Sequence, residues 1–302
     1  MCFCRGRNDE LMDAYLATLT RRRYSAKSVQ TYRYALGNFT SYLAAAGIDD
    51  VQDVDAETLE VYRLHLVERG LASASLEVFM RSVRLWFNWL EETGQLFLNP
   101  CRSLVVPKPG RKLLPVPTEE DIRKLLAQPN VATPKGIRDR ALIEVAYASG
   151  ARREELVRMN IFDPDAKAQT VRIQGKGRKE RVVPLGRHAV HWLKQYLDHA
   201  RPKLLAGKID QEALWLGNSG APQGGQSMNL QVKTHAQAAG TSVPVTLHAL
   251  RRACATHMLR HGAHPVQIQM LLGHATMRHL SQYLRLSITD IKRMHEKARP
   301  GR

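Results

Sequence analysis

Apolar residues recur every three or four positions through most of the first hundred residues, which is the spacing of helices that bury one face. The clearest run places five of them on one stripe: Val29, Tyr32, Leu36, Phe39 and Leu43. Ser25 or Ser28 can cap the start of this helix, and Gly47 can end it. Asp55 is suited to cap the next helix. The pattern predicts a small bundle of four helices.

The fourth predicted helix starts after Ser73 or Ser75, and Asn99-Pro100 would stop it. Its two tryptophans are expected in the core or in helix packing rather than stacked on bases: Trp86 and Trp89. The opposite side carries polar residues spaced three and four apart, hence on one face: Arg81, Arg84 and Asn88. A solvated helix face would explain this trio; in a protein that also has a phosphate-handling site, we predict that the trio contacts DNA.

Composition changes sharply after the bundle, which suggests four segments. We predict a tail at residues 1–8, a helical DNA-binding domain at 9–99, a linker at 100–117 and a second domain at 118–302. The linker is rich in proline and basic residues, and Lys108 is a predicted DNA contact within it. An extended basic linker between two domains suits a clamp around a duplex.

The second domain alternates between helical patterns and one hairpin. Thr118 can cap its first helix. The segment TVRIQGKGRKERVVPL alternates and turns, as a β-hairpin does. Helices are predicted at about 137–148, 151–159, 186–205, 227–239, 248–261, 265–272 and 276–284. Pro265 fits a first helical turn, and Gly273 a helix end. The predicted fold is mostly α with a small antiparallel β-sheet.

Charge adds a partner class to this picture. The chain of 302 residues has a formal net charge of +17. Residues 1–100 hold 11 Lys/Arg against 13 Asp/Glu, whereas the remainder holds 34 against 15. Such an excess on one domain favours a polyanion. The first domain also has a stretch without acids, and its predicted DNA contacts are Arg22 and Lys27.

The sequence argues against a membrane partner and a secreted location. No run of 18 or more residues is apolar, and the N-terminus MCFCRGRNDE lacks an apolar signal region. The four cysteines have no zinc-like spacing and are expected to be reduced thiols. We therefore expect a cytoplasmic protein, associated with the nucleoid.

Six residues of the second domain form a set with one evident use: Arg152, Lys176, His248, Arg251, His274 and Tyr283. Arginine clamps phosphate through a planar fork and stays charged. Lysine between two glycines can approach a backbone closely and donate a proton to a leaving oxygen. Histidines can accept or donate protons, and a tyrosine phenol can attack phosphorus when a base assists it. The set predicts phosphodiester cleavage.

The order and local context of these residues resemble the tyrosine recombinases, or phage integrase family, and most closely its short Xer-like members. The matching motifs are SGARREEL, GKGRKER with VPL, HALRR with ATHML, and LLGH followed by a tyrosine nine residues later. The resemblance covers roughly residues 9–297. It implies a helical core-binding, SAM-like domain followed by an α+β catalytic domain. Two residues of the hairpin join the predicted DNA contacts: Arg178 and Lys179.

The resemblance also implies a reaction and its partners. Tyrosine attack gives a 3′-phosphotyrosyl intermediate and a free 5′ hydroxyl, and strand exchange passes through a Holliday junction. No metal, ATP or other cofactor is required. The expected partner is double-stranded DNA with inverted half-sites, bound by a homodimer on one site and a homotetramer in synapsis. A mobile element, a plasmid or a chromosome-dimer site would be the target.

Two other functions stay open at this level. A type IB topoisomerase uses similar chemistry, and a DNA-binding regulator could descend from a decayed enzyme; the complete set of six argues against decay. The sequence departs from the family pattern at Arg153, Leu247 and Arg252, and in the stretch MRHLSQY after His274. Three histidines have the spacing of a helical metal site: His257, His261 and His264. We predict no metal there, because no carboxylate lies in residues 246–289.

Overall fold

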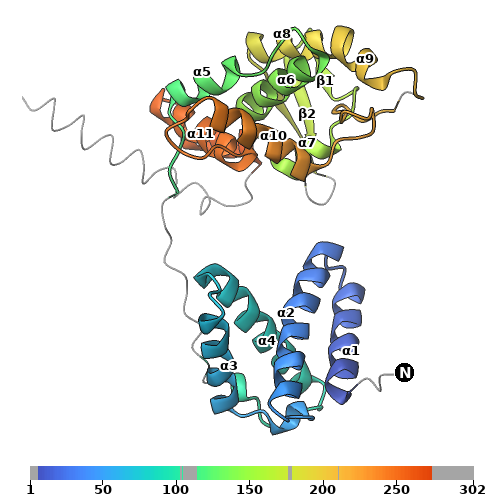
Figure 1. The fold of residues 1–302 in the computed structure, drawn as a ribbon, viewed down its shortest axis with the longest axis vertical. Helices are drawn as coiled ribbons and strands as arrows, with labels where there is room; N and C mark the ends of the chain where they lie inside the picture. Colours follow the sequence, from blue (N-terminus) through green and yellow to red (C-terminus); the bar gives the residue numbers. More distant parts are fainter. Residues whose placement is uncertain (1–5, 103, 105–113, 176–178, 210, 274–302) are drawn as a thin grey trace, which may run out of the picture. The chain divides into compact units, whose positions relative to one another are not determined.

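The chain divides into two compact units, residues 1–112 and 113–302 (Figure 1). The computed structural model describes residues 6–102, 104, 114–175, 179–209 and 211–273. Each unit has its own hydrophobic core, so each is described separately. Within the described residues, no helix is long and apolar enough to cross a membrane.

The first unit is a four-helix bundle, as the apolar spacing predicted. Its elements are α1 (Arg7–Arg21), α2 (Ala26–Ala45), η1 (Val51–Asp53), α3 (Ala56–Glu68), α4 (Ser73–Glu92) and η2 (Pro100–Arg102). Ser25 caps α2 by accepting a hydrogen bond from the Ser28 backbone N–H. Asp55 caps α3 through Thr58 in the same way.

Aromatic rings from three helices build the centre of this bundle. Phe39 of α2 contacts Tyr62, Trp86 and Phe87 at centroid distances of 4.8–6.3 Å. Trp86 is fully buried, and Trp89 packs against Tyr15 of α1. Both tryptophans therefore belong to the bundle's packing, as predicted.

The predicted end of α4 was wrong. The helix begins at Ser73 without a side-chain cap and ends at Glu92, before Gly94 with its positive φ of 71°. Asn99-Pro100 instead lies at the start of η2, where the Asn99 side chain accepts a hydrogen bond from the Cys101 backbone N–H. Glycine takes a left-handed conformation at little cost, so Gly94 stops the helix before the proline does.

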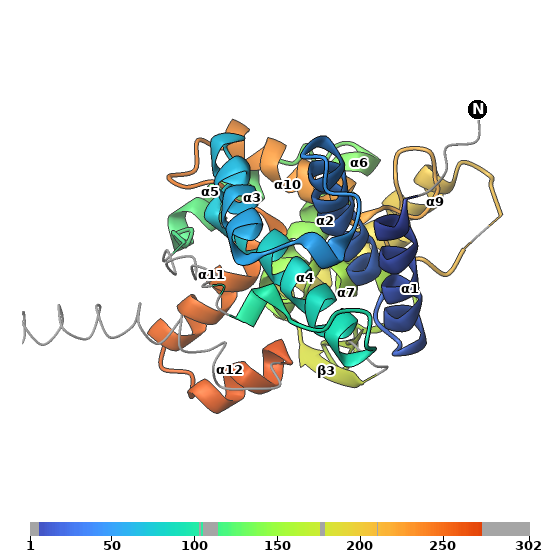
Figure 2. The ribbon, with the colours of Figure 1, turned by 90° about the horizontal axis from the view of Figure 1, so that it is seen from below.

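The second unit is mostly helical and carries a small antiparallel sheet. Its helices are α5 (Glu119–Ala127), α6 (Pro134–Ser149), α7 (Arg153–Arg158), α8 (Arg187–Gln195), the π-turn η4 (Tyr196–Ala200), α9 (Arg201–Leu205), α10 (Gly225–Ala238), α11 (Leu247–Arg260) and α12 (Pro265–Leu272). α6 is buried along most of its length and packs against α8 and α11. Figure 2 shows α12 beside α11 and near β3, with which it is in contact.

The predicted hairpin is confirmed and gains a third strand. β2 (Thr170–Gln174) pairs antiparallel with β3 (Glu180–Pro184), and the short β1 (Pro164–Asp165) pairs with β2. Inward-facing residues alternate along the strands, as in any sheet with one buried face. The fold class is therefore the predicted one, mostly α with a small antiparallel sheet.

One predicted helix is interrupted. The segment at 186–205 is three pieces, α8, η4 and α9, because a π-turn ends at Ala200, two residues before Pro202. Proline has no N–H and crowds the carbonyl four residues earlier, so the helix widens there. The predicted caps at Thr118, Pro265 and Gly273 are all present.

Candidate active site

Arg152 owes its place to the turn between α6 and α7. Gly150 ends α6 in the left-handed conformation, with φ of 56°, and Arg152 is the N-cap of α7. A Cβ on Gly150 would lie 2.5 Å from the Leu272 side chain. Only glycine satisfies both the backbone and the packing here, so the end of α12 can approach this turn closely.

Glu155 lies one turn into α7 and holds two arginines. It accepts hydrogen bonds from the Arg152 backbone N–H at 2.8 Å and from Arg152 Nη1 at 2.8 Å. Arg181 of β3 binds the same carboxylate with both Nη atoms, at 3.0 and 2.8 Å. Burial alone would raise the pKa of Glu155, but the bonds from Arg181 and Arg152 lower it to about 2. The group is therefore a carboxylate at neutral pH.

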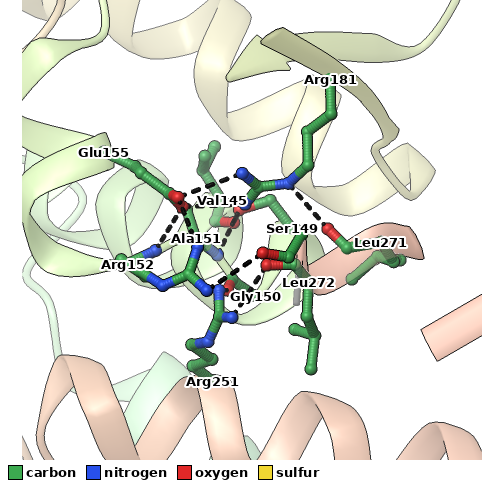
Figure 3. Close-up of polar contacts among 11 residues, drawn as sticks. Val145, Ser149, Gly150, Ala151, Arg152, Glu155, Arg181, Arg251, Leu271 and Leu272 are labelled. Atoms are coloured by element: carbon green, nitrogen blue, oxygen red, sulfur yellow. Dashed lines mark hydrogen bonds and ion pairs between the residues drawn. The ribbon is translucent and has the colours of Figure 1, made fainter. Parts of the chain in front are cut away.

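Arg251 of α11 is the most buried of the three arginines, with 2% of its surface exposed. Its Nη1 donates to the Gly150 carbonyl at 2.6 Å, and its Nη2 donates to the Leu272 carbonyl at 2.8 Å. Arg152 Nη2 donates to the next carbonyl, that of Gly273, at 3.1 Å. Figure 3 shows the three arginines entering from different elements and converging on the ends of α6 and α12.

His248 is exposed in the first turn of α11, three residues before Arg251. Its surroundings lower its pKa, first through desolvation and then through the positive charges of Arg252, Arg251 and Arg152. The imidazole is therefore neutral at pH 7 and able to accept a proton.

Four of the predicted site residues lie outside the described residues: Lys176, Arg178, His274 and Tyr283. Lys108 of the predicted linker lies outside them too. Their neighbours are placed: the Gly175 backbone N–H donates to the Lys179 carbonyl at 2.7 Å, and Gly273 caps α12 with φ of 63°. Lys179 is exposed beside the hairpin tip. The structure thus brings together Arg152, His248 and Arg251, and it positions the residues just before Lys176 and His274.

The sequence reading missed Arg181 as a site residue and gave Glu155 no role beyond its motif. The pattern held a usable signal for Arg181. In the strand that ends in VPL, alternate residues face inward, so Arg181 lies on the same face as the buried Val183. An arginine on a buried strand face requires a partner, and an acidic residue near Arg152 was the available one.

The predicted DNA contacts of the first unit are at its surface. Arg22 and Lys27 are exposed at the α1–α2 turn, and Arg81 is exposed on α4 near Glu77. Arg84 is half-buried. The Asn88 side-chain oxygen already accepts a hydrogen bond from Asn99 at 2.9 Å. Only its amide nitrogen could therefore donate to a phosphate without breaking a bond inside the unit.

The three histidines with metal-like spacing have other partners. His257 is buried between the Tyr147 hydroxyl, at 2.9 Å, and the Pro117 carbonyl, at 3.0 Å. His261 pairs with Glu119 at 2.8 Å, and His264 caps α12. In the described part of the chain, no group of three or more His, Cys, Asp or Glu residues could hold a metal ion.

The departures from the family pattern also have structural uses. The Leu247 backbone N–H donates to the Asn229 side chain at 3.1 Å, a bond that proline could not make. Arg252 donates to the Pro115 carbonyl at 3.1 Å and so ties the start of the second unit to α11. Arg153 pairs with Glu154. Its side chain packs over Gly225 of α10, where an added Cβ would lie 2.9 Å from Arg153 Cγ.

Comparison with known proteins gives the same answer over both units. The phage integrase family model matches residues 116–289, and the phage integrase N-terminal SAM-like domain matches residues 12–94. The chain is 33% identical to tyrosine recombinase XerC 2 of Ralstonia nicotianae, over 96% of this chain and 86% of that protein. It is also 33% identical to tyrosine recombinase XerD of Shewanella oneidensis, over 97% of each.

Solved structures share the fold. A λ integrase tetramer bound to a Holliday junction matches with a TM-score of 0.74 at 18% identity, covering 91% of this chain and 76% of that one. XerH recombinase in a post-cleavage complex with palindromic difH matches with a TM-score of 0.74 at 23% identity, covering 92% and 80%. Motifs, fold and relatives agree, and the chain belongs to the phage integrase family as an Xer-like tyrosine recombinase.

Proposed function

We propose that this site-specific recombinase cleaves DNA with Tyr283 as the nucleophile and Arg152, Lys176, His248, Arg251 and His274 as its assisting residues. The observation that supports this most is the anchoring of Arg152 and Arg251. Both bind consecutive carbonyls at the end of α12, directly before His274, and His248 lies on the same helix as Arg251. A phosphate placed there would meet two guanidinium groups and a neutral imidazole.

The proposed step is an in-line displacement. The Tyr283 oxygen attacks phosphorus while His248 accepts the phenolic proton. Arg152 and Arg251 stabilise the charge on the nonbridging oxygens, and His274 donates a hydrogen bond to one of them. The bond from phosphorus to the 5′ oxygen breaks, and Lys176 protonates that oxygen. One phosphoester replaces another, so religation by a second strand's 5′ hydroxyl needs no ATP.

The proposed partner is double-stranded DNA with inverted half-sites. The recombinase would act on this DNA in the cytoplasm, at the nucleoid. A homodimer would fill one site, and a homotetramer would hold two. The λ integrase structures, described as a dimer on a core site and a tetramer on a Holliday junction, support this assembly. In the proposed arrangement, residues 9–99 bind one face, 118–302 bind the other, and the linker 100–117 runs between them.

The natural target would be a mobile element, a plasmid or a chromosome-dimer site. The topoisomerase and the decayed regulator are less well supported. The relatives that match almost the whole chain are recombinases, and the two clamp arginines and His248 are in place. Sequencing the DNA that stays covalently attached to the protein would identify the site.

A nicked suicide substrate carrying that site tests the proposal. The nick lets the short 5′-hydroxyl strand diffuse away, so the covalent complex accumulates and migrates as a slower band. Wild-type protein should form this complex in EDTA, because no step is assigned to a metal. Tyr283→Phe should bind the site but form none. A covalent complex in that variant would place the nucleophile elsewhere.

A further inference from the structure

We infer that Arg181 is a positioning residue of the cleavage reaction: it offsets the charge of Glu155 and leaves Arg152 positively charged and fixed for the phosphate. This inference rests on the proposed function, in which Arg152 binds that phosphate. Arg181 is not a catalytic residue in this scheme, since it acts through Glu155.

Arg181 joins three elements at one point. Two of its nitrogens bind the Glu155 carboxylate of α7, and its Nε donates to the Leu271 carbonyl of α12 at 2.9 Å. Its side chain passes so close to Gly273 that a Cβ there would lie 3.0 Å from Nη1. Only 14% of the side chain is exposed, whereas 43% of the Arg152 side chain is. Arg181 is therefore the more buried of the two arginines on Glu155, and Arg152 is the more accessible one; Figure 3 shows both on that carboxylate.

Charge explains why the second arginine matters. Glu155 is 5% exposed and carries a full negative charge, so Arg152 and Glu155 alone would form a neutral pair. A neutral pair gives little attraction to a phosphate, and the carboxylate repels it. With Arg181 bound to the same carboxylate, the three groups sum to one positive charge, and the only accessible cation among them is Arg152. In a partly buried cluster this difference is weakly screened.

Geometry adds a second contribution. Arg181 donates one hydrogen bond to each oxygen of Glu155 from the β3 side, and Arg152 binds the same carboxylate from the α7 side. This arrangement holds the Arg152 fork between Glu155 and the Gly273 carbonyl. Preorganised charge of this kind lowers the barrier because nothing has to reorient during the reaction.

The experiment compares Arg181→Met with a matched control from the same sheet. Arg172 of β2 also pairs with an acid, Asp163 at 3.1 Å, but 48% of its side chain is exposed and it lies away from the cluster. Each variant would be tested on an ordinary phosphodiester and on a methylphosphonate, in which a methyl group replaces one nonbridging oxygen and removes the negative charge. Single-turnover cleavage at saturating DNA, DNA affinity and thermal unfolding would be measured.

Arg181→Met should cleave the phosphodiester roughly 10- to 100-fold more slowly than wild type, with DNA affinity changed by less than about threefold. On the methylphosphonate the deficit in cleavage rate should fall below about threefold, because the nonbridging oxygen whose negative charge Arg152 stabilises is gone. Arg172→Met should match wild type on both substrates. Arg181→Lys, which keeps the charge but loses the fork, should fall between wild type and Arg181→Met.

A second test removes the carboxylate charge. In Arg181→Met/Glu155→Gln no anion is left to cancel Arg152, and the glutamine carbonyl can still accept the hydrogen bond from Arg152 Nη1, so the double variant should cleave no more slowly than Arg181→Met. Equal deficits on both substrates, or further slowing in the double variant, would overturn the inference and make Arg181 a structural residue only. If Arg181→Met does not fold, Arg181→Lys decides by the same substrate comparison. Failure of wild type to form the covalent complex would instead refute the proposed function.

Discussion

Replacing Arg251 by alanine should destabilise the second unit as well as stop cleavage. The side chain is almost fully buried and satisfies two carbonyls of buried residues, those of Gly150 and Leu272. Leaving a buried acceptor without a partner costs about 1–3 kcal/mol. Two such losses give about 2–6 kcal/mol, which at about 2–4 °C per kcal/mol for a unit of this size is a fall in Tm of roughly 4–24 °C.

Differential scanning calorimetry on the full chain would measure this change, with Arg152→Ala as the control. Arg152 is far more exposed, and its partner Glu155 would keep Arg181, so its loss should cost at most about 1 kcal/mol. Both variants should slow cleavage by at least ~100-fold. The reasoning fails if Arg251→Ala melts within about 1 °C of wild type, or if Arg152→Ala falls as far.

Three further predictions follow from the site and its supports. The cleavage rate should rise with pH and reach half of its maximum below pH 6.5, the ordinary pKa of histidine, because desolvation and three arginines lower the pKa of His248. A half-maximum above pH 6.5, or an unchanged pH dependence in His248→Gln, would contradict this. Burial would raise the pKa of Asp121, but bonds from Ser242 and Thr118 lower it from 3.8 to about 2. Its ionised form should therefore contribute about 2 kcal/mol above pH 4 that is lost as pH falls toward 2, and urea unfolding of Asp121→Asn should lack that dependence. Residues 113–302 alone should bind the site more weakly than the whole chain and with strong salt dependence, and equal affinity would exclude the clamp.

The sequence predicted those parts of the fold that depend on local patterns. Apolar spacing located the helices, the caps at Asp55 and Thr118 were readable from residue type, and alternation located the hairpin. The end of α4 was misjudged because Gly94 and Pro100 can each end a helix, and local propensity alone does not rank the two. The glycine, Gly94, acts first along the chain.

The sequence predicted those residues of the site that belong to a motif. It did not predict the contacts that depend on tertiary packing. Arg152 comes from the start of α7, whereas His248 and Arg251 come from α11, and the motifs identified all three. The ion pair between Arg181 and Glu155 joins residues 26 positions apart, and an arginine on a short strand usually reads as surface charge. The capture of carbonyls by Arg251 depends on how α6 and α12 meet, which no local pattern encodes.

That meeting of two helix ends supplies carbonyl partners to two cationic groups of the site. A buried arginine is usually paired with a carboxylate, which would cancel the charge needed for phosphate. Here Arg251 binds the carbonyls of Gly150 and Leu272, and Arg152 binds that of Gly273. Carbonyls at helix C-termini carry only a partial negative charge, about half a unit for a whole helix. They orient the two guanidinium groups, and Glu155, which Arg152 also binds, has Arg181 as a second arginine to offset its charge.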